Sequence, residues 1–318
     1  MILTGGTACD NVGWGGLDWR LMPPPTASAD SVPAEAVADE EVTYAGAYGP
    51  LLLAGERDGI RATLVVVGEI RGEQLLPLRD TPEESDRVRR LTGEGSRWVL
   101  FSDGVRVGRL RADGAGSDAG YCPARPTVTG VVEVVPTASS ADRLLALPES
   151  SGDGRAYEAF RPLAHVYDQR VATLSWAGEE IPRNQASWPA DGLVAAREDI
   201  RAFRPAGSPG PAVAATFMYR DRLAVSPAPA GAYALFVLGA LSGDEYLQGF
   251  SWYRPTDTEG KGAPRFFDHL DWDGDGSGEI LLDVFGTERR WFAALSQRDG
   301  RWVRTFSDAC GEGPIAGG

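Results

Sequence analysis

A short run of acidic residues holds the clearest chemistry in this sequence. Asp271, Asp273 and Asp275 alternate with other residues, and Glu279 follows closely. Calcium takes about six to eight oxygen ligands at roughly 2.3–2.6 Å, and alternating carboxylates in a tight loop can all point toward one ion. The run therefore predicts a Ca²⁺ site formed by these four carboxylates and by Ser277, which is expected to offer its backbone carbonyl.

The residues after the run distinguish this loop from an EF-hand. An EF-hand places a bidentate Glu at about the twelfth position of its loop, where this sequence has Leu282. Ile280–Leu282 is instead an apolar run typical of a strand. We therefore predict that neighbouring strands over 266–269 and 280–284 flank the loop, and that strands over 291–295 and 302–306 extend the same sheet.

The segment Asp271–Glu279 resembles the calcium loop of FG-GAP and related propeller-type repeats. In those repeats Asp-x-Asp-Gly-Asp-Gly-x-x-Asp/Glu connects two β-strands, and a single copy of that pattern stands here. The resemblance implies bound Ca²⁺ in a strand–loop–strand setting and no particular activity. The alternative is a solvated acidic turn. Repulsion between four nearby carboxylates disfavours it, because a bound cation removes that repulsion.

Composition narrows the class of protein. The chain has 318 residues, with 31 Lys and Arg against 45 Asp and Glu, a formal net charge of −14. An acidic balance disfavours nucleic acid and anionic membrane surfaces as partners. No segment approaches the roughly 18 apolar residues that a membrane-spanning helix needs. The 40 Gly and 22 Pro suit many short strands joined by turns.

The three cysteines are predicted to have separate roles. Cys9 follows Thr7-Ala8, which resembles the small-residue box that precedes the lipidated cysteine of bacterial lipoproteins. We predict a lipid anchor at Cys9, with a free thiol as the alternative. Cys122 and Cys310 are predicted to form a disulfide in an oxidising compartment. The alternative is a pair of unlinked cysteines in the core.

Other catalytic and binding motifs give weaker signals. The two histidines, His165 and His269, exclude a three-histidine zinc site, and neither has a partner at metal-ligand spacing in the sequence. The sequence lacks a nucleophile elbow, a phosphate loop and a dinucleotide fingerprint. Four tryptophans in the second half of the chain could form a stacking surface for a glycan or peptide: Trp176, Trp188, Trp252 and Trp272. Aromatic residues of β proteins are more often part of the core. Trp272 could also lie over the calcium loop or contact a ligand.

The chain is predicted to divide into four parts. Residues 1–42 are expected to be an N-terminal anchor and flexible linker, because the stretch after Pro23 is too poor in apolar side chains to order itself. Residues 43–147 are expected to form one β lobe, and residues 155–310 a second that holds the calcium loop. Residues 311–318 are expected to be a disordered tail.

Local signals predict a mainly β fold, a β-rich α+β class with antiparallel meandering sheets in two lobes and a few short helices. Asp-Gly pairs at 58–59, 103–104 and 299–300 each separate two apolar runs, which is a strong hairpin signal. Thr81-Pro82-Glu83-Glu84 is a capping box that begins a helix. A second short helix is expected over 193–203, and the segment 160–174 is ambiguous.

These features favour a non-enzymatic, extracytoplasmic calcium-binding protein of the periplasm, cell envelope or secreted fraction. It would be a binding or envelope-scaffold lipoprotein whose ligand is an unidentified protein or glycan. One alternative is a secreted hydrolase in which the calcium loop is structural. Another is a cytoplasmic protein whose acidic loop binds nothing. A hydrolase needs a pair of carboxylates, and the sequence singles out none.

Overall fold

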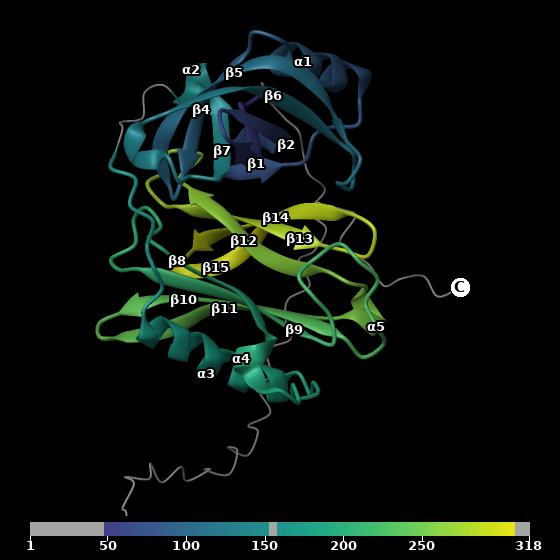
Figure 1. Ribbon diagram of the computed structural model, residues 1–318, viewed down its shortest axis with the longest axis vertical. Coiled ribbons are helices and arrows are strands. Elements are labelled where there is room, and N and C mark those ends of the chain that lie inside the picture. Colours follow the sequence, from purple (N-terminus) through teal and green to yellow (C-terminus); the bar gives the residue numbers. More distant parts are fainter. Residues whose placement is uncertain (1–47, 153–157, 309–318) are drawn as a thin grey trace, which may run out of the picture. The chain divides into compact units, whose positions relative to one another are not determined.

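The structure is a computed structural model that describes residues 48–152 and 158–308. These residues belong to one compact unit, Ala45–Gly318, and Figure 1 labels their elements. The predicted anchor and linker over 1–42, the tail over 311–318, Cys9 and Cys310 lie outside the described residues. The predicted mainly β, antiparallel fold is confirmed.

The first sheet closes into a six-stranded barrel. Its strands run in the order β1-β7-β4-β5-β6-β2, and the pairing of β1 with β2 completes the ring. A short β3 (Gln74–Leu76) pairs with β2 outside the ring. The bounds of the barrel strands are β1 Leu51–Asp58, β2 Arg61–Arg71, β4 Arg97–Ser102, β5 Val105–Asp118, β6 Arg125–Val134 and β7 Arg143–Pro148.

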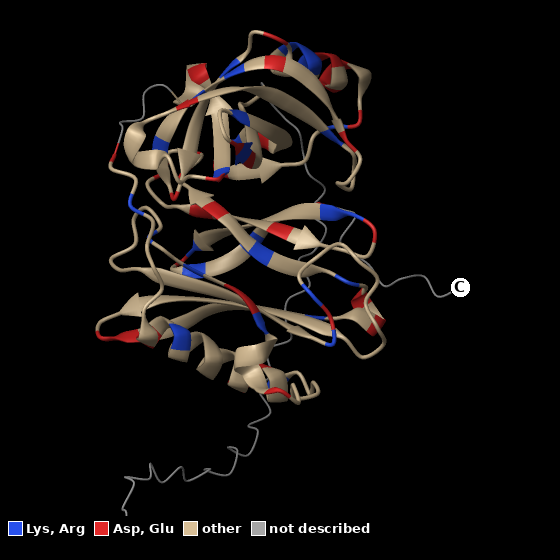
Figure 2. Cartoon of the chain, in the orientation of Figure 1, with Lys and Arg blue, Asp and Glu red and all other residues tan. Residues whose placement is uncertain are grey.

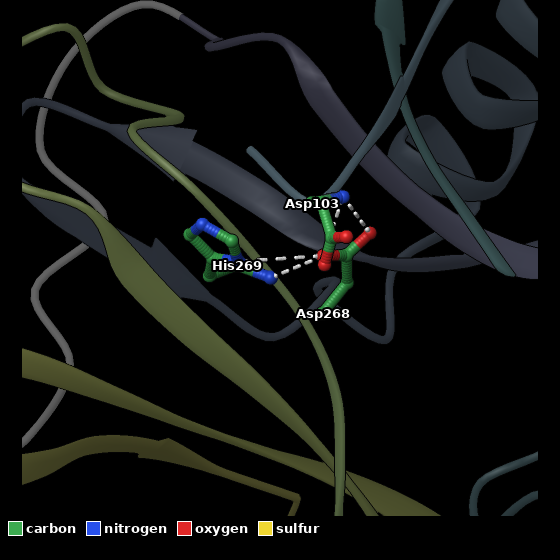
Figure 3. Close-up of side chains that lie close together, drawn as sticks. All are labelled: Asp103, Asp268 and His269. Carbon is green, nitrogen blue, oxygen red and sulfur yellow. Dashed lines mark hydrogen bonds and ion pairs between the residues drawn. The ribbon is translucent and has the colours of Figure 1, made fainter. Parts of the chain in front are cut away.

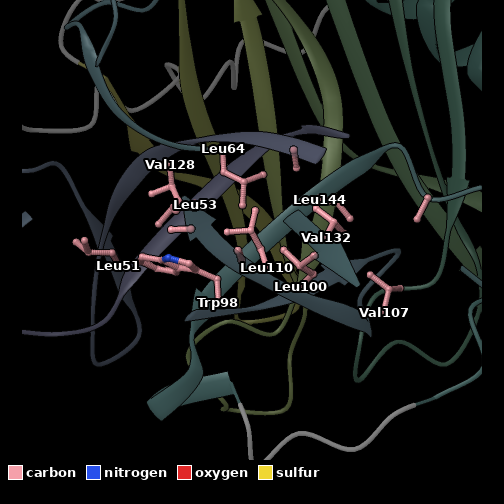
Figure 4. Packing of buried hydrophobic residues seen from close by; sticks show 14 of the residues in the cluster. Leu51, Leu53, Leu64, Trp98, Leu100, Val107, Leu110, Val128, Val132 and Leu144 are labelled. Carbon is pink, nitrogen blue, oxygen red and sulfur yellow. The ribbon is translucent and has the colours of Figure 1, made fainter. Parts of the chain in front are cut away.

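Apolar side chains fill the barrel interior, as Figure 4 shows for Leu53, Leu64 and Leu110. Successive residues of a strand point to opposite faces. Leu51 and Leu53 of β1 therefore belong to the interior cluster, while Leu52 packs in a second cluster outside the barrel. The uninterrupted apolar run of β1 follows from this burial on both faces.

Two further sheets form the second half of the chain. One has the order β11-β10-β9-β8, and the other is the meander β12-β13-β14-β15. The bounds are β8 Arg197–Phe203, β9 Ala212–Tyr219, β10 Tyr233–Ser242, β11 Glu245–Pro255, β12 Ala263–Leu270, β13 Glu279–Phe285, β14 Arg290–Arg298 and β15 Arg301–Ser307. Arginines are interspersed with Asp and Glu over all three sheets (Figure 2).

The meander of β12 to β15 packs on both of its faces. Leu281 of β13 lies in the cluster shared with the outer face of the barrel, whereas Ile280 and Leu282 lie in the cluster shared with the β8–β11 sheet. Every residue of β13 is buried. This confirms the expectation that the apolar run after the acidic loop is a strand covered on both sides.

The helices cover edges and outer faces. Helix α1 (Pro82–Thr92) confirms the predicted start, because the Thr81 side chain accepts a hydrogen bond from the Glu84 N–H at 3.2 Å. Helix α3 (Tyr167–Arg183) forms within the ambiguous segment and beyond it, and it packs on the β8–β11 sheet. The remaining short helices are η1 Pro136–Ala138, α2 Glu149–Gly152, α4 Gly192–Ala196 and α5 Thr256–Glu259.

The helix predicted over 193–203 is wrong beyond Ala196. Residues Arg197–Phe203 form β8, the edge strand that pairs with β9. At its end Ala202 and Phe203 are both buried, and Phe203 packs in the cluster shared with the β12–β15 sheet. Pairing and burial of that end therefore override the helix-like local pattern, as tertiary context often does.

All three predicted hairpins are present. Residue pairs next to the turns are Asp58 with Arg61, Ser102 with Val105, and Arg298 with Arg301. In the second hairpin both turn residues have positive φ, 50° at Asp103 and 73° at Gly104. This is the backbone that a two-residue type I′ turn requires.

Candidate metal site

The acidic loop connects two adjacent antiparallel strands. Strand β12 ends at Leu270, β13 begins at Glu279, and these two residues are paired. The loop therefore leaves and returns at the same point of the sheet. The strand–loop–strand setting predicted from the sequence is confirmed, and helices do not flank the loop as they would in an EF-hand.

The structure brings the three alternating carboxylates together. One oxygen each from Asp271, Asp273 and Asp275 lies within 4.8 Å of the others. Backbone N–H groups of the loop hold their orientation. Asp273 Oδ1 accepts from the Asp275 N–H at 3.1 Å, and Asp275 Oδ1 accepts from the Ser277 N–H at 2.6 Å. Four of the five predicted ligand residues therefore belong to one tight loop.

Glycines supply the turn that orients Asp271. Its Oδ1 accepts from the Gly274 N–H at 2.7 Å, and its Oδ2 accepts from the Gly276 N–H at 3.2 Å. Both glycines have positive φ, 85° and 92°. Side chains with a Cβ rarely adopt this backbone, so the Gly residues are required for the carboxylates to converge.

Glu279 is the buried neighbour of the site, and its carboxylate is not among the three that lie within 4.8 Å of one another. It is only 3% exposed, and its Oε2 accepts a hydrogen bond from the Trp272 N–H at 3.1 Å. Within the described ranges 48–152 and 158–308, no Lys, Arg or His forms an ion pair with it. Burial, followed by the charge of Asp273, raises the pKa of Glu279 to about 8. Burial likewise raises the pKa of Asp273. Placing a divalent cation here would stabilise both carboxylates in their charged form.

A neighbouring segment fixes the loop from outside the meander. The Gly278 N–H donates to the Ala206 carbonyl at 3.1 Å. A Cβ on Gly207 would lie 2.6 Å from the Gly276 carbonyl oxygen. This close backbone approach ties the loop to the segment that follows β8, so the carboxylates are positioned by two sheets.

The aromatic surface considered from the sequence is largely core. Trp272 is 4% exposed and packs in the cluster between barrel and meander, so its interpretation as an exposed ligand contact is wrong. Its indole anchors the loop to the protein. Trp176 and Trp252 are also buried, and Trp188 is 51% exposed.

The cysteine predictions reach beyond the described residues, because Cys9 and Cys310 lie outside them. Two contacts of the described residues concern Cys122 and Asp308, the last described residue. The Cys122 N–H donates to the Arg290 carbonyl at 2.9 Å, and the Asp308 N–H donates to the Phe292 carbonyl at 3.1 Å. Cys122 and the described end of the chain therefore both bind the same stretch of β14.

Sequence reasoning missed a second cluster, Asp103, Asp268 and His269. Ligand atoms of these residues also lie within 4.8 Å of one another. His269 has no partner at metal-ligand spacing along the sequence, as predicted. The fold nevertheless brings Asp103 and Asp268 close to it. Burial and the Asp268 charge raise the pKa of Asp103 to about 6. The Asp103-Gly104 turn was the available signal, but its partner is 165 residues away.

Comparisons with known proteins give no relative: no family model, no curated protein and no solved structure matches this chain. The resemblance to FG-GAP-type loops therefore rests on the loop residues themselves. Among the described residues, no helix is long and apolar enough to cross a membrane.

Proposed function

We propose that this protein is a calcium-stabilised, extracytoplasmic β protein with a non-enzymatic binding or envelope-scaffold role. The observation that carries the proposal is the combination of three converging carboxylates with a fourth, Glu279, which is buried and has no ion-pair partner among the described residues. A solvated acidic turn has no reason to bury a fourth carboxylate beside the other three. A cation gives that burial a physical purpose, because it offsets both the repulsion and the desolvation of Glu279.

The ligand set favours calcium over other common cations. All the proposed donors are oxygens: the carboxylates of Asp271, Asp273, Asp275 and Glu279 and the carbonyl of Ser277. Hard oxygen donors suit Ca²⁺ and Mg²⁺, whereas Zn²⁺ and Cu²⁺ favour nitrogen or sulfur. A loop with several carboxylates suits Ca²⁺ better, because Mg²⁺ keeps most of its water and demands stricter geometry.

An ion at this place would have a structural role. It would join the end of β12 to the start of β13 at the edge where the 205–208 segment also binds. The function of the protein would then lie in the surface that this rigid edge supports. An unidentified protein or glycan is the partner we propose for that surface.

Thermal unfolding tests the calcium site. Metal-stripped protein should be stabilised by added Ca²⁺, by about 2.7 kcal/mol at a hundredfold excess over Kd, and Mg²⁺ should stabilise it less. Asp273→Asn should remove most of the response. Asp299→Asn is the matched control, because Asp299 is an exposed turn residue outside the site. A melting temperature that changes with neither Ca²⁺ nor chelator would contradict the proposal.

The extracytoplasmic location is proposed from the same calcium site and from the cysteines. A Cys122–Cys310 disulfide is supported by the two contacts that bring Cys122 and Asp308 to β14. Peptide mass spectrometry of unreduced protein, purified from its native host, should find the Cys122–Cys310 cross-link. The same experiment should find that the mature N-terminal peptide begins at an acylated Cys9. Two free thiols and an unmodified Cys9 would contradict the proposed location.

A hydrolase is the second candidate, favoured by one observation. Asp103 and Asp268 both line a cavity of about 360 Å³, which is within the size range of small-molecule sites. Two carboxylates that meet in a cavity are the feature that the hydrolase alternative requires. Hydrolysis of a panel of chromogenic glycosides and esters, lost in Asp103→Asn and kept in Asp273→Asn, would favour this candidate over the scaffold.

A further inference from the structure

The second cluster joins the barrel to the meander. Asp103 stands in the β4–β5 turn, and Asp268 and His269 lie near the end of β12 (Figure 3). A register shift between Phe266 and Asp268 precedes the pair. Such bulges re-aim side chains and are frequent beside functional sites. Here the bulge directs the Asp268 carboxylate toward the backbone of the barrel turn.

The ring of His269 is held in one tautomer. Its Nε2 lies 2.9 Å from the Arg204 carbonyl oxygen. A carbonyl oxygen only accepts hydrogen bonds, so Nε2 carries the hydrogen. In the neutral ring Nδ1 then offers a lone pair. Nδ1 has no hydrogen-bond partner among the described residues, and the side chain is only 2% exposed.

That lone pair faces a carboxylate. Nδ1 of His269 is 3.5 Å from Oδ1 of Asp268, which is itself 3% exposed. Two electron-rich atoms at this distance in a buried place repel each other unless a cation or a proton lies between them. A metal ion bound to both side chains would remove this repulsion.

The carboxylate of Asp268 is already oriented by the backbone. Its Oδ1 accepts from the His269 N–H at 2.8 Å and from the Asp103 N–H at 3.0 Å. Its Oδ2 is 3.2 Å from the same Asp103 nitrogen. These bonds use both lone pairs of Oδ1 and one of Oδ2, so Oδ2 keeps a lone pair that can bind a cation. Gly104 fixes the ring from the other side, since a Cβ there would be 2.8 Å from His269 Nε2.

We propose that Asp103, Asp268 and His269 Nδ1 bind a divalent transition metal of the zinc class. One imidazole nitrogen with two carboxylates suits Zn²⁺ and its neighbours better than Ca²⁺, which takes oxygen ligands alone. The second nitrogen of a metal-binding histidine almost always donates to a carbonyl or carboxylate. Arg204 already supplies that carbonyl, so the outer support of the site is in place.

The geometry leaves one side of the metal open. Three protein ligands are typical of catalytic zinc sites, in which water or substrate takes the fourth position. Asp103 and Asp268 line the cavity of about 360 Å³, together with Arg57, Arg143 and Arg201. Guanidinium groups around an open metal position suit a small ligand with a carboxylate or phosphate group. This inference is independent of the calcium loop.

Zinc titration of the full-length, metal-stripped protein tests the proposal. Calcium is kept in excess so that the acidic loop does not compete. We expect one tight Zn²⁺ per chain, and a visible ligand-field spectrum when Co²⁺ replaces it. Asp103→Asn and His269→Gln should weaken Zn²⁺ binding by more than the roughly 10–100-fold effect of losing an outer-shell partner. Asp142→Asn is the matched control, because Asp142 lines the same cavity outside the cluster.

Folding of the variants must be checked separately. Asn tolerates the positive φ of 50° at Asp103, so Asp103→Asn should keep the wild-type circular dichroism and melting temperature. Loss of zinc binding in that folded variant supports the site. The proposal is overturned if Asp103→Asn binds Zn²⁺ with wild-type affinity. It is also overturned if Asp273→Asn is the only variant that loses zinc binding. Absence of zinc binding in the wild type also overturns it.

Discussion

The Trp272 N–H donates to Oε2 of Glu279 at 3.1 Å and so connects the two ends of the acidic loop. Trp272 is anchored in the cluster between barrel and meander, and Glu279 is the first residue of β13. The bond therefore fixes the Glu279 carboxylate at the base of the loop, whether or not an ion is bound. The loop is organised by the folded protein before any ligand arrives, which lowers the ordering cost of binding.

Glu279→Gln separates this organising role from cation binding. The amide oxygen can still accept from the Trp272 N–H, and the buried charge is gone. The free energy of unfolding without metal should therefore stay within about 1 kcal/mol of wild type, since the hydrogen bond is kept. Calcium affinity should fall at least about tenfold, equivalent to about 1.4 kcal/mol. Calorimetric titration and urea unfolding measure the two quantities.

Glu73→Gln is the control for that substitution. Glu73 contributes to the negative field at Asp273 but lies in the exposed turn between β2 and β3. It should change calcium affinity less than Glu279→Gln does. Equal effects of the two changes would mean that Glu279 acts through its charge at a distance and is not a ligand.

A buried ion pair ties the barrel to the meander. The side chains of Arg125 and Asp308 are 3% and 1% exposed, and Arg125 also donates to the Val66 carbonyl at 3.0 Å. Asp308→Ala leaves the guanidinium buried without its carboxylate, which should destabilise the protein by about 3–5 kcal/mol. Chemical denaturation followed by tryptophan fluorescence measures this loss.

An exposed ion pair gives the matched comparison. Arg61 and Asp113 are 52% and 42% exposed, so Asp113→Ala should cost less than about 1 kcal/mol. The double change Arg125→Met and Asp308→Leu should recover much of the lost stability, because apolar groups of similar size can replace a buried pair. Similar losses for Asp308→Ala and Asp113→Ala would show that the buried pair does not hold the two sheets together.

Features encoded within a few residues could be predicted from the sequence. The Asp-Gly turns, the cap at Thr81 and the loop from Asp271 to Glu279 each depend on local backbone chemistry. The strands on both sides of the loop followed from the apolar run after Glu279. The structure has all of these elements where the local residues indicated them.

Features that depend on distant partners could not be predicted. The barrel closes through β1 with β2 and β7, and a hairpin signal alone does not reveal the second pairing. The local sequence of β8 has a helix-like pattern, and its pairing with β9 makes it a strand. Asp103 and Asp268 are 165 residues apart in the sequence, and His269 directly follows Asp268. No local spacing of residues encodes the contact of Asp103 with this pair.

Two matched turns allow the packing around His269 to be measured. Gly104 and Gly300 have φ of 73° and 75°, and each follows an Asp with positive φ. Alanine at either position carries the backbone cost of about 1–2 kcal/mol. Gly300 has nothing within 4 Å of a new Cβ, whereas at Gly104 the Cβ would be 2.8 Å from His269 Nε2. Gly104→Ala should therefore be more destabilising than Gly300→Ala by about 1–3 kcal/mol, the usual cost of overpacking.

Urea unfolding of both variants gives the difference directly, because the backbone term cancels. A difference near zero would mean that the His269 ring moves without cost, in which case Gly104 does not fix it. A large difference that disappears in the Gly104→Ala, His269→Ala double variant would assign the cost to that contact.

Alkaline pH should destabilise the junction between barrel and meander through Tyr121. This side chain is 2% exposed and stacks on Phe292 with ring centroids 5.0 Å apart. Burial, followed by the charge of Asp283, raises the pKa of Tyr121 well above its ordinary value. The folded state therefore keeps the phenol proton over a pH range in which the unfolded chain releases it.

The sign of the effect follows from proton linkage. Below about pH 10 the phenol is neutral in both states, so stability does not depend on its titration. Above that pH the unfolded state binds fewer protons, and stability should fall by about 1.4 kcal/mol per pH unit for this group. Tyr121→Phe keeps the stacked ring and removes the proton. Its free energy of unfolding relative to wild type should rise by about 1 kcal/mol between about pH 10 and about pH 11, because the unfolded phenol is already half ionised near pH 10.

Tyr167→Phe is the control, because Tyr167 is 70% exposed. Urea unfolding at a series of pH values, with wild type and both variants in parallel, separates the Tyr121 contribution from general alkaline effects. If wild type and Tyr121→Phe lose stability at the same rate above about pH 10, the phenol ionises in the folded state and Tyr121 does not limit the alkaline stability of the junction.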